Sequence, residues 1–204
     1  TLHVAAPRDG QQLRETLREA INISDAPSLI RFPKGSINPD IPAFERRDGI
    51  DVLYRGESAD ILLVSIGAFA TIAVEAAAQA YREGVGVTVI DPRWVKPLPT
   101  SLVTMAQRYK SVVVLEDGIK HGGIASTISE LFRESQLNVP VHSIGVPLTF
   151  LEHSKRNQIL EDLGITVQNI TRSLVAWSST DNSIALKAEM QHPLDENERR
   201  KPLR

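Results

Sequence analysis

Two cations flank a proline at the end of a short apolar run, and this is the stretch of sequence most suggestive of chemistry. Residues 28–36 read SLIRFPKGS, so Arg31 and Lys34 stand on either side of Pro33 where the apolar run stops. Pro33 fixes the approach of the chain to Lys34, and Gly35 permits an unusual backbone conformation. A cation at the carboxyl end of a parallel strand is well placed to bind a phosphate group. A solvated strand end explains these residues equally well, so both interpretations stay open on this segment alone.

A second candidate is a helix that opens from glycines. Residues 116–126 read EDGIKHGGIAS and follow an apolar run. The free amides at such a helix start suit an anion. The spacing of Gly118, Gly122 and Gly123 does not match the dinucleotide fingerprint G-x-G-x-x-G or a phosphate-binding loop. We favour a tight turn and close packing as the role of these glycines, and keep an anion site as the alternative.

The histidines do not form a metal site in the sequence. The five histidines show no H-x-x-x-H spacing, and no G-x-S-x-G motif marks a nucleophilic serine. His121 and His153 fall in loops at or near strand ends, where a general acid or base could act. Their role stays open, and we expect no catalytic residue and no metal ligand within this chain.

Composition excludes several classes of function. The net charge is −2, which does not indicate nucleic-acid binding, and no apolar run approaches the ~18–20 residues needed to span a membrane. The 204 residues include no cysteine, which removes disulfides and thiolate chemistry and fits a reducing cytoplasm. The chain starts at Thr1 and enters a predicted strand at once, so we interpret its start as a truncation within a larger protein.

The elements that must position these residues form an α/β pattern. Asp9 is a plausible helix N-cap, and an apolar stripe that includes Leu13, Leu17 and Ile21 predicts an amphipathic helix between two strands. Farther along, apolar runs without alternation are separated by helices, which indicates a mainly parallel open sheet covered by helices on both faces. We therefore predict a βαβ unit at residues 1–35, a linker with one short strand at 36–59, an α/β domain at 60–177 and a disordered polar tail at 178–204.

Four segments, in this order and spacing, resemble one enzyme family. RFPKG, DPRWVKPL, VVVLEDGIKHGGIAS and GVPLTFLEHSKRNQILEDLGI are similar to segments of the 1-deoxy-D-xylulose-5-phosphate synthases, and the resemblance covers about residues 1–177. It implies that residues 1–35 are the end of a domain that binds the pyrimidine of thiamine diphosphate. It also implies that residues 60–177 are a transketolase-type C-terminal domain.

The resemblance also implies an activity. Members of this family decarboxylate pyruvate and transfer the two-carbon unit to D-glyceraldehyde 3-phosphate, which supplies isoprenoid, thiamine and pyridoxal phosphate synthesis. They are homodimers that use thiamine diphosphate and Mg²⁺, which domains upstream of Thr1 would bind, so this chain alone should be inactive. The family's second cation in the RFPKG segment, usually arginine, contacts the acceptor phosphate, and that position is Lys34 here. Arg31 is its partner cation, which we expect to turn toward the domain interface.

Two alternatives remain. The chain could come from another thiamine diphosphate enzyme with the same C-terminal domain, such as a transketolase or a 2-oxoacid dehydrogenase β subunit, although RFPKG and DPRWVKPL fit these less well. It could also be a free-standing, non-catalytic module of the transketolase C-terminal type.

Overall fold

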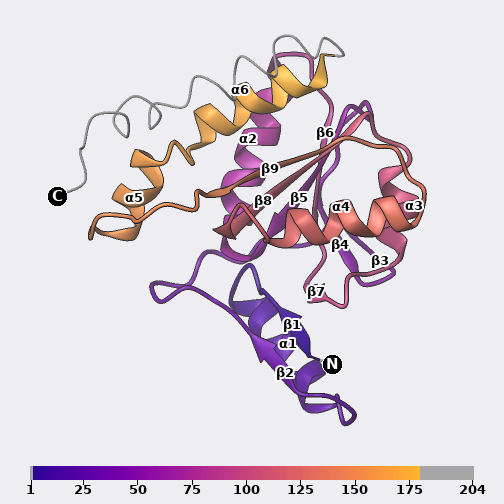
Figure 1. Cartoon of the computed structure of the whole chain (residues 1–204), viewed down its shortest axis with the longest axis vertical. Coiled ribbons are helices and arrows are strands. Elements are labelled where there is room, and N and C mark those ends of the chain that lie inside the picture. Colours follow the sequence, from indigo (N-terminus) through magenta and orange to yellow (C-terminus); the bar gives the residue numbers. More distant parts are fainter. Residues whose placement is uncertain (1, 180–204) are drawn as a thin grey trace, which may run out of the picture.

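The computed structural model describes residues 2–179, which contain two sheets (Figure 1). The larger sheet has six strands in the order β3-β4-β6-β5-β8-β9, and the smaller has three in the order β2-β1-β7. The prediction of a polar tail falls mostly on residues 180–204, outside the described part of the chain. None of the described helices combines the length and hydrophobicity needed to cross a bilayer.

Four parallel strands form the centre of the larger sheet. They are β6 (Val87–Asp91), β5 (Ile61–Ile66), β8 (Ser111–Ile119) and β9 (Val141–Val146). Strands β5 and β6 are buried along their whole length, which explains why their sequences are apolar runs without alternation. These four strands and their order along the chain match the prediction.

Helices cover both faces of this sheet (Figure 1). One face packs against α2 (Ala70–Arg82), which follows the short helix η1 (Gly67–Phe69), and against α6 (Val167–Ser178), which follows α5 (Arg156–Asp162). The other face packs against α3 (Ser101–Ala106) and α4 (Ile124–Glu134). The predicted fold class, a mainly parallel sheet with helices on both faces, is confirmed.

The structure differs from the sequence prediction at the segment 36–59, which does not act only as a linker. It contains β3 (Glu45–Arg47) and β4 (Ile50–Tyr54), and β4 pairs antiparallel with β6, so the larger sheet begins before residue 60. Ile50 and Val52 are buried in the core, but Asp51 between them is also fully buried. The short strand predicted in this segment corresponds to β4, but its membership of the larger sheet was not predicted, because a buried carboxylate requires partners that sequence spacing does not show.

The smaller sheet begins as a βαβ unit. Strands β1 (His3–Ala5) and β2 (Ser28–Ile30) pair in parallel, and α1 (Gly10–Ile21) connects them. The third strand, β7 (Trp94–Lys96), comes from the connection after β6 and pairs antiparallel with β1. The smaller sheet is therefore tied to the larger one through the chain itself.

Helix α1 begins at the predicted residue, but the side that it buries is not the predicted apolar side. The carboxylate of Asp9 accepts a hydrogen bond from the Gln12 amide at 2.7 Å, which confirms Asp9 as the N-cap. The predicted apolar stripe, however, lies at the surface: Leu17 is 47% exposed and Ile21 is 82% exposed. The buried side of α1 carries Gln12 and Thr16 instead. Helical periodicity was correct, whereas the inference that the apolar side is the buried side was wrong for this helix.

Candidate functional site

The two cations of RFPKG lie directly after β2, on an exposed loop. The Arg31 amide still donates to the Ala5 carbonyl at 2.9 Å, so the strand pairing continues to the first cation. Both side chains are exposed, and within residues 2–179 the Lys34 ammonium has no hydrogen-bond or ion-pair partner. The structure therefore places Lys34 as a free cation at the carboxyl end of a parallel strand.

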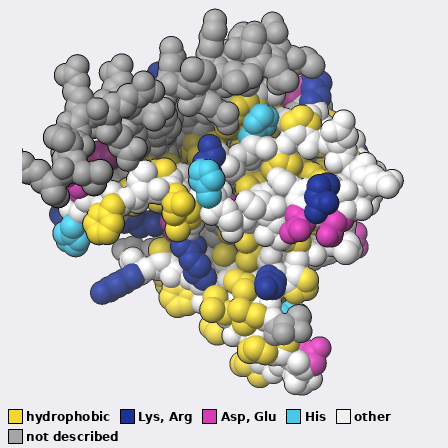
Figure 2. Space-filling view, viewed as in Figure 1, with side chains coloured by type: hydrophobic (Ala, Val, Ile, Leu, Met, Phe, Trp, Pro, Cys, Tyr) yellow, Lys and Arg dark blue, Asp and Glu magenta, His cyan; other side chains and the backbone are white. Residues whose placement is uncertain are grey.

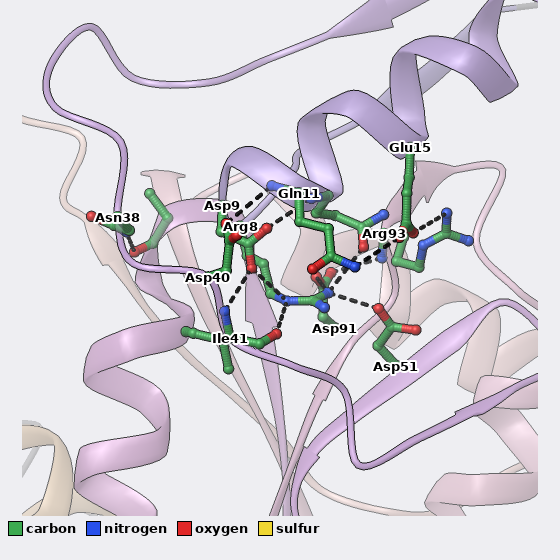
Figure 3. A network of polar contacts seen from close by, with 12 residues as sticks. Arg8, Asp9, Gln11, Glu15, Asn38, Asp40, Ile41, Asp51, Asp91 and Arg93 are labelled. Carbon is green, nitrogen blue, oxygen red and sulfur yellow. Dashed lines mark hydrogen bonds and ion pairs between the residues drawn. The ribbon is translucent and has the colours of Figure 1, made fainter.

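The chain that follows these cations crosses the carboxyl edge of the larger sheet. The Asn38 side chain donates to the Ala68 carbonyl at 3.0 Å, in the short helix that follows β5 (Figure 3). The side chain of Asp40 accepts from the Gln11 amide at 3.1 Å, at the start of α1. The RFPKG loop is thereby held near the edge where the parallel strands of the larger sheet end, which is the usual ligand-binding edge of an open α/β sheet.

Glu116, near the carboxyl end of β8, explains the glycine-opened helix. Its carboxylate accepts hydrogen bonds from the amides of Ile124 at 2.8 Å and Ala125 at 3.3 Å, at the start of α4. A side chain on Gly123 would collide with this carboxylate, so only glycine fits there. The protein's own carboxylate therefore occupies the helix N-terminus, which supports the structural role of these glycines over an anion site.

The charge of Arg31, from the loop after β2, also acts on Glu116. Burial raises the pKa of Glu116, while the two amide hydrogen bonds and the positive charge of nearby Arg31 act to lower it. The orientation of Arg31 toward the interface between the two parts stays a prediction. Within residues 2–179, neither the Arg31 nor the Lys34 side chain forms a hydrogen bond or an ion pair, and the two cations differ in that the charge of Arg31 acts on Glu116.

The two candidate histidines, His121 and His153, form no hydrogen bond with the groups around Glu116 or with the RFPKG loop within the described residues. His121 and His153 are both exposed, and neither imidazole makes a hydrogen bond within the described chain. Next to them, Asp117 pairs with Arg156 through two contacts of 3.0 and 2.9 Å, and the guanidinium of Arg156 lies 5.5 Å from the centre of the Phe69 ring. This ion pair attaches α5 to the sheet edge and leaves the histidines without a defined role.

The most buried ionic cluster was not identified from the sequence. Asp51 on β4 and Asp91 on β6 are paired directly across the two strands, and both are buried. The guanidinium of Arg8, from the segment between β1 and α1, reaches Asp51 at 2.7 Å and Asp91 at 2.8 Å (Figure 3). Like charges directly opposite in a sheet repel one another, so the shared cation is what makes this pairing possible.

The two carboxylates differ because only one has a second cation. Burial raises the pKa of Asp91 even though Arg8 lies against it. Burial also acts to raise the pKa of Asp51, but hydrogen bonds from Arg46 at 2.5 Å and from Arg8 outweigh it and hold that pKa below its usual value. The signal in the sequence was an aspartate inside each of two apolar runs, IDVLY and VTVID, although spacing could not show that Arg8 lies between them.

The described residues do not fit the cofactors that the resemblance implies. Residues 2–179 hold no group of three or more histidine, aspartate or glutamate side chains arranged to bind a metal ion such as Mg²⁺. The glycine-opened helix that could have met a diphosphate already binds Glu116. Among residues 2–179, the structure therefore offers no group that would hold Mg²⁺ or the diphosphate of the cofactor.

Comparison with known proteins identifies the family. A family model described as the transketolase C-terminal domain matches residues 51–170. The 1-deoxy-D-xylulose-5-phosphate synthase of Mycobacteroides abscessus is 48% identical over 179 residues, which cover 86% of this chain and 28% of that protein. The chain belongs to the 1-deoxy-D-xylulose-5-phosphate synthase family. The synthase of Nocardia farcinica is 46% identical over 184 residues, with 86% of this chain and 29% of that protein covered.

The resemblance seen in the sequence is thus confirmed, and the chain corresponds to the portion of the synthase that carries the transketolase C-terminal domain. The matched domain begins at residue 51, within β4, which agrees with the inclusion of β4 in the larger sheet. The chain spans less than a third of the length of these synthases.

Solved structures support the same fold. A split-gene transketolase, described as an inactive β4 tetramer, matches with a TM-score of 0.74 and 26% identity, covering 94% of this chain and 59% of that chain. The transketolase of Campylobacter jejuni matches with a TM-score of 0.65 and 18% identity, covering 84% of this chain and 25% of that one. The second match shows the fold alone.

Proposed function

We propose that this chain is part of a 1-deoxy-D-xylulose-5-phosphate synthase and that its RFPKG loop binds the phosphate of the acceptor substrate. The whole enzyme would condense pyruvate, with loss of CO₂, with D-glyceraldehyde 3-phosphate. The observation that carries the site is Lys34, an exposed cation without a partner among residues 2–179, at the carboxyl end of β2 and near the carboxyl edge of the larger sheet. An unpaired cation is available to a phosphate, whereas the charge of Arg31 also acts on Glu116.

The remaining properties of the enzyme belong to the whole protein. We propose that it is a cytoplasmic homodimeric transferase that supplies isoprenoid, thiamine and pyridoxal phosphate synthesis. Thiamine diphosphate and Mg²⁺ would be bound by parts of the protein other than residues 2–179. The parallel pairing of β1 and β2 across α1 supports the proposal that residues 1–35 are the end of a pyrimidine-binding domain.

We further propose that the chain is inactive by itself. The chain spans 28% of the length of the Mycobacteroides abscessus synthase, and the related split-gene transketolase is described as inactive in its β4 form. The expected result is no product from pyruvate and D-glyceraldehyde 3-phosphate with the 204-residue chain, and turnover when the complete synthase is assayed.

The phosphate site is tested by Lys34→Met in the complete synthase. Loss of a charged hydrogen bond to phosphate should reduce kcat/KM for D-glyceraldehyde 3-phosphate by about 1.5–3 kcal/mol, which is roughly 10- to 150-fold. The same variant should leave the weaker reaction with unphosphorylated D-glyceraldehyde nearly unchanged. Lys34→Arg should retain or improve the phosphate contact because the guanidinium can bind two phosphate oxygens.

The matched control is Lys96→Met. Lys96 is an exposed lysine on β7, at the opposite edge of the smaller sheet from β2, so this variant removes the same charge away from the loop. An unchanged kcat/KM for the phosphorylated acceptor in Lys34→Met would remove Lys34 from the site. A loss of equal size in both variants would indicate a general effect of charge rather than a phosphate contact.

One structural neighbour, the split-gene transketolase at 26% identity, favours one alternative enzyme. A transketolase would use a phosphorylated ketose, rather than pyruvate, as the donor of the two-carbon unit. Product analysis of the complete enzyme with each donor separates these two functions.

A further inference from the structure

The RFPKG loop is anchored at both ends to one short stretch of chain. At its start, the amide of Arg31 donates to the carbonyl of Ala5 at the end of β1. Beyond its end, Ile41 is held on both sides of its backbone by the two residues that precede α1. The amide of Ile41 donates to the Asp9 carboxylate at 3.0 Å, and its carbonyl accepts from the Arg8 guanidinium at 3.1 Å (Figure 3).

Asp9 uses its two carboxylate oxygens for two different tasks. Oδ1 accepts the hydrogen bond from the Gln12 amide and caps α1, whereas Oδ2 accepts the hydrogen bond from the Ile41 amide. Serine, threonine or asparagine would cap the helix about as well as aspartate. None of them has a second acceptor oxygen on the same side chain that could bind Ile41, so the cap alone does not explain why an aspartate stands here.

Arg8 also connects the backbone of Ile41 to the larger sheet. Its Nε donates to the Ile41 carbonyl, and its Nη1 binds the Asp51 and Asp91 carboxylates of β4 and β6. A planar guanidinium held by several partners has little freedom to move. The segment that returns from the RFPKG loop is therefore fixed relative to the edge of the larger sheet, as well as to α1.

We propose that Arg8 and Asp9 are positioning residues for the phosphate-binding loop. They would hold the returning segment at Ile41 and thereby limit where the loop can place Lys34, without touching the substrate themselves. This inference deepens the proposed function and depends on it, because it assigns Lys34 the role of phosphate ligand. It predicts that loss of the hydrogen bonds to the Ile41 backbone weakens the binding of a phosphorylated acceptor more than the binding of an unphosphorylated one.

The test is Asp9→Asn in the complete synthase. Asparagine preserves the helix cap through its carbonyl oxygen but presents an NH₂ group to the Ile41 amide, so two donors oppose one another in place of that hydrogen bond. It also removes the ion pair of 3.3 Å between Asp9 Oδ2 and Arg8 Nε, the other residue that holds Ile41. The KM for D-glyceraldehyde 3-phosphate should rise roughly three- to tenfold, as expected for the loss of one hydrogen bond, with little change for D-glyceraldehyde. Asp9→Ser, which also caps the helix but adds no opposing donor, should show the same selectivity with a smaller rise.

A second readout follows the loop directly. Amide hydrogen exchange of residues 32–41 should become faster in Asp9→Asn, while exchange in β5 and β8 stays as it is in the parent enzyme. The control is Asp25→Asn, which removes one exposed charge from the turn between α1 and β2 without touching Ile41. This control should change neither the KM nor the exchange rate.

The outcomes separate this inference from the proposed function. If Lys34→Met raises the KM but Asp9→Asn does not, the positioning role is wrong and the phosphate site stands. If Asp9→Asn affects both acceptors equally, its role is structural and the inference is also wrong. If Lys34→Met has no effect, the proposed site fails, and with it the role of Asp9 toward Lys34. In the expected case, the double variant Asp9→Asn/Lys34→Met has a KM for the phosphorylated acceptor close to that of Lys34→Met alone, because both changes act through one contact.

Discussion

Two helices of similar length bury opposite kinds of surface. Helix α2 packs five alanines against the larger sheet, and α1 buries Gln12 and Thr16 while Leu17 and Ile21 face solvent. Figure 2 shows hydrophobic side chains gathered over the lower end of the molecule, which carries the β1–α1–β2 unit. The larger sheet is held together by apolar packing on both faces, whereas the smaller unit is attached to it through buried ionic contacts.

The difference indicates how each region is stabilised. Apolar burial is additive and tolerant, because each side chain contributes according to the area it removes from water. An ionic cluster such as Arg8 with Asp51 and Asp91 depends on every member being present, since a carboxylate that loses its partner remains buried. Removal of one residue should therefore have a larger effect in the ionic attachment than a typical apolar truncation has in the core.

The strongest test of this difference is Arg8→Met. Methionine keeps most of the volume of arginine but leaves two adjacent buried carboxylates without their shared cation. We expect the free energy of unfolding to fall by about 3–5 kcal/mol at neutral pH, measured by urea denaturation of the chain. Arg14→Met, an exposed arginine on α1, is the matched control and should change stability by less than about 0.5 kcal/mol.

A second substitution tests whether the buried carboxylate is the cause of the stability loss in Arg8→Met. Asp51 keeps its ion pair with Arg46, so Asp91 is the carboxylate left without a cation. Adding Asp91→Asn to Arg8→Met removes this buried charge and should restore part of the lost stability. If Arg8→Met costs no more than its control, the cluster does not hold the two sheets together, and the contrast between the regions is wrong.

The next test compares two leucines. Leu174 on α6 is fully buried against the larger sheet, and Leu17 on α1 is 47% exposed. Leu174→Ala should destabilise the chain by about 2–5 kcal/mol through lost burial and a cavity. Leu17→Ala should cost less than about 0.5 kcal/mol, as is usual for a surface change. Equal costs in the two urea titrations would mean that the apolar side of α1 is buried in solution, contrary to the structure.

Local features of this fold could be predicted from the sequence. The four parallel strands are apolar runs of the right length, and the helix cap at Asp9 depends on residues three positions apart. The two cations of RFPKG also stand out locally, because they follow a strand end directly. Each of these predictions depends on residues close together in the sequence, where spacing carries the information.

Features that depend on distant partners could not be predicted in this way. The short strand predicted within residues 36–59 corresponds to β4, but its place in the larger sheet was not predicted, because Asp51 interrupts its apolar pattern and its partner Arg8 is 43 residues away in sequence. The exposed side of α1 was assigned wrongly because periodicity shows that a helix has an apolar side but not what lies against it. The second role of Asp9 was missed for the same reason, since Ile41 lies 32 residues farther along the chain.

The smallest expected effect concerns Glu116, which is buried without a direct cationic partner, in contrast to Asp51 with its two arginines. Burial raises the pKa of Glu116 above its ordinary value of 4.5, so the folded state favours the protonated carboxyl. The contribution of Glu116 to the free energy of unfolding should therefore fall as the pH rises from about 4.5 through that raised pKa, while glutamine does not titrate. The stability of Glu116→Gln relative to the parent should accordingly increase across this interval and then level off. Urea titrations of both chains between about pH 4 and pH 7 measure this difference, with Glu130→Gln on the exposed side of α4 as the control. A relative stability that decreases with pH would mean that Arg31 and the helix amides outweigh burial, so that the lone carboxylate behaves like the paired Asp51.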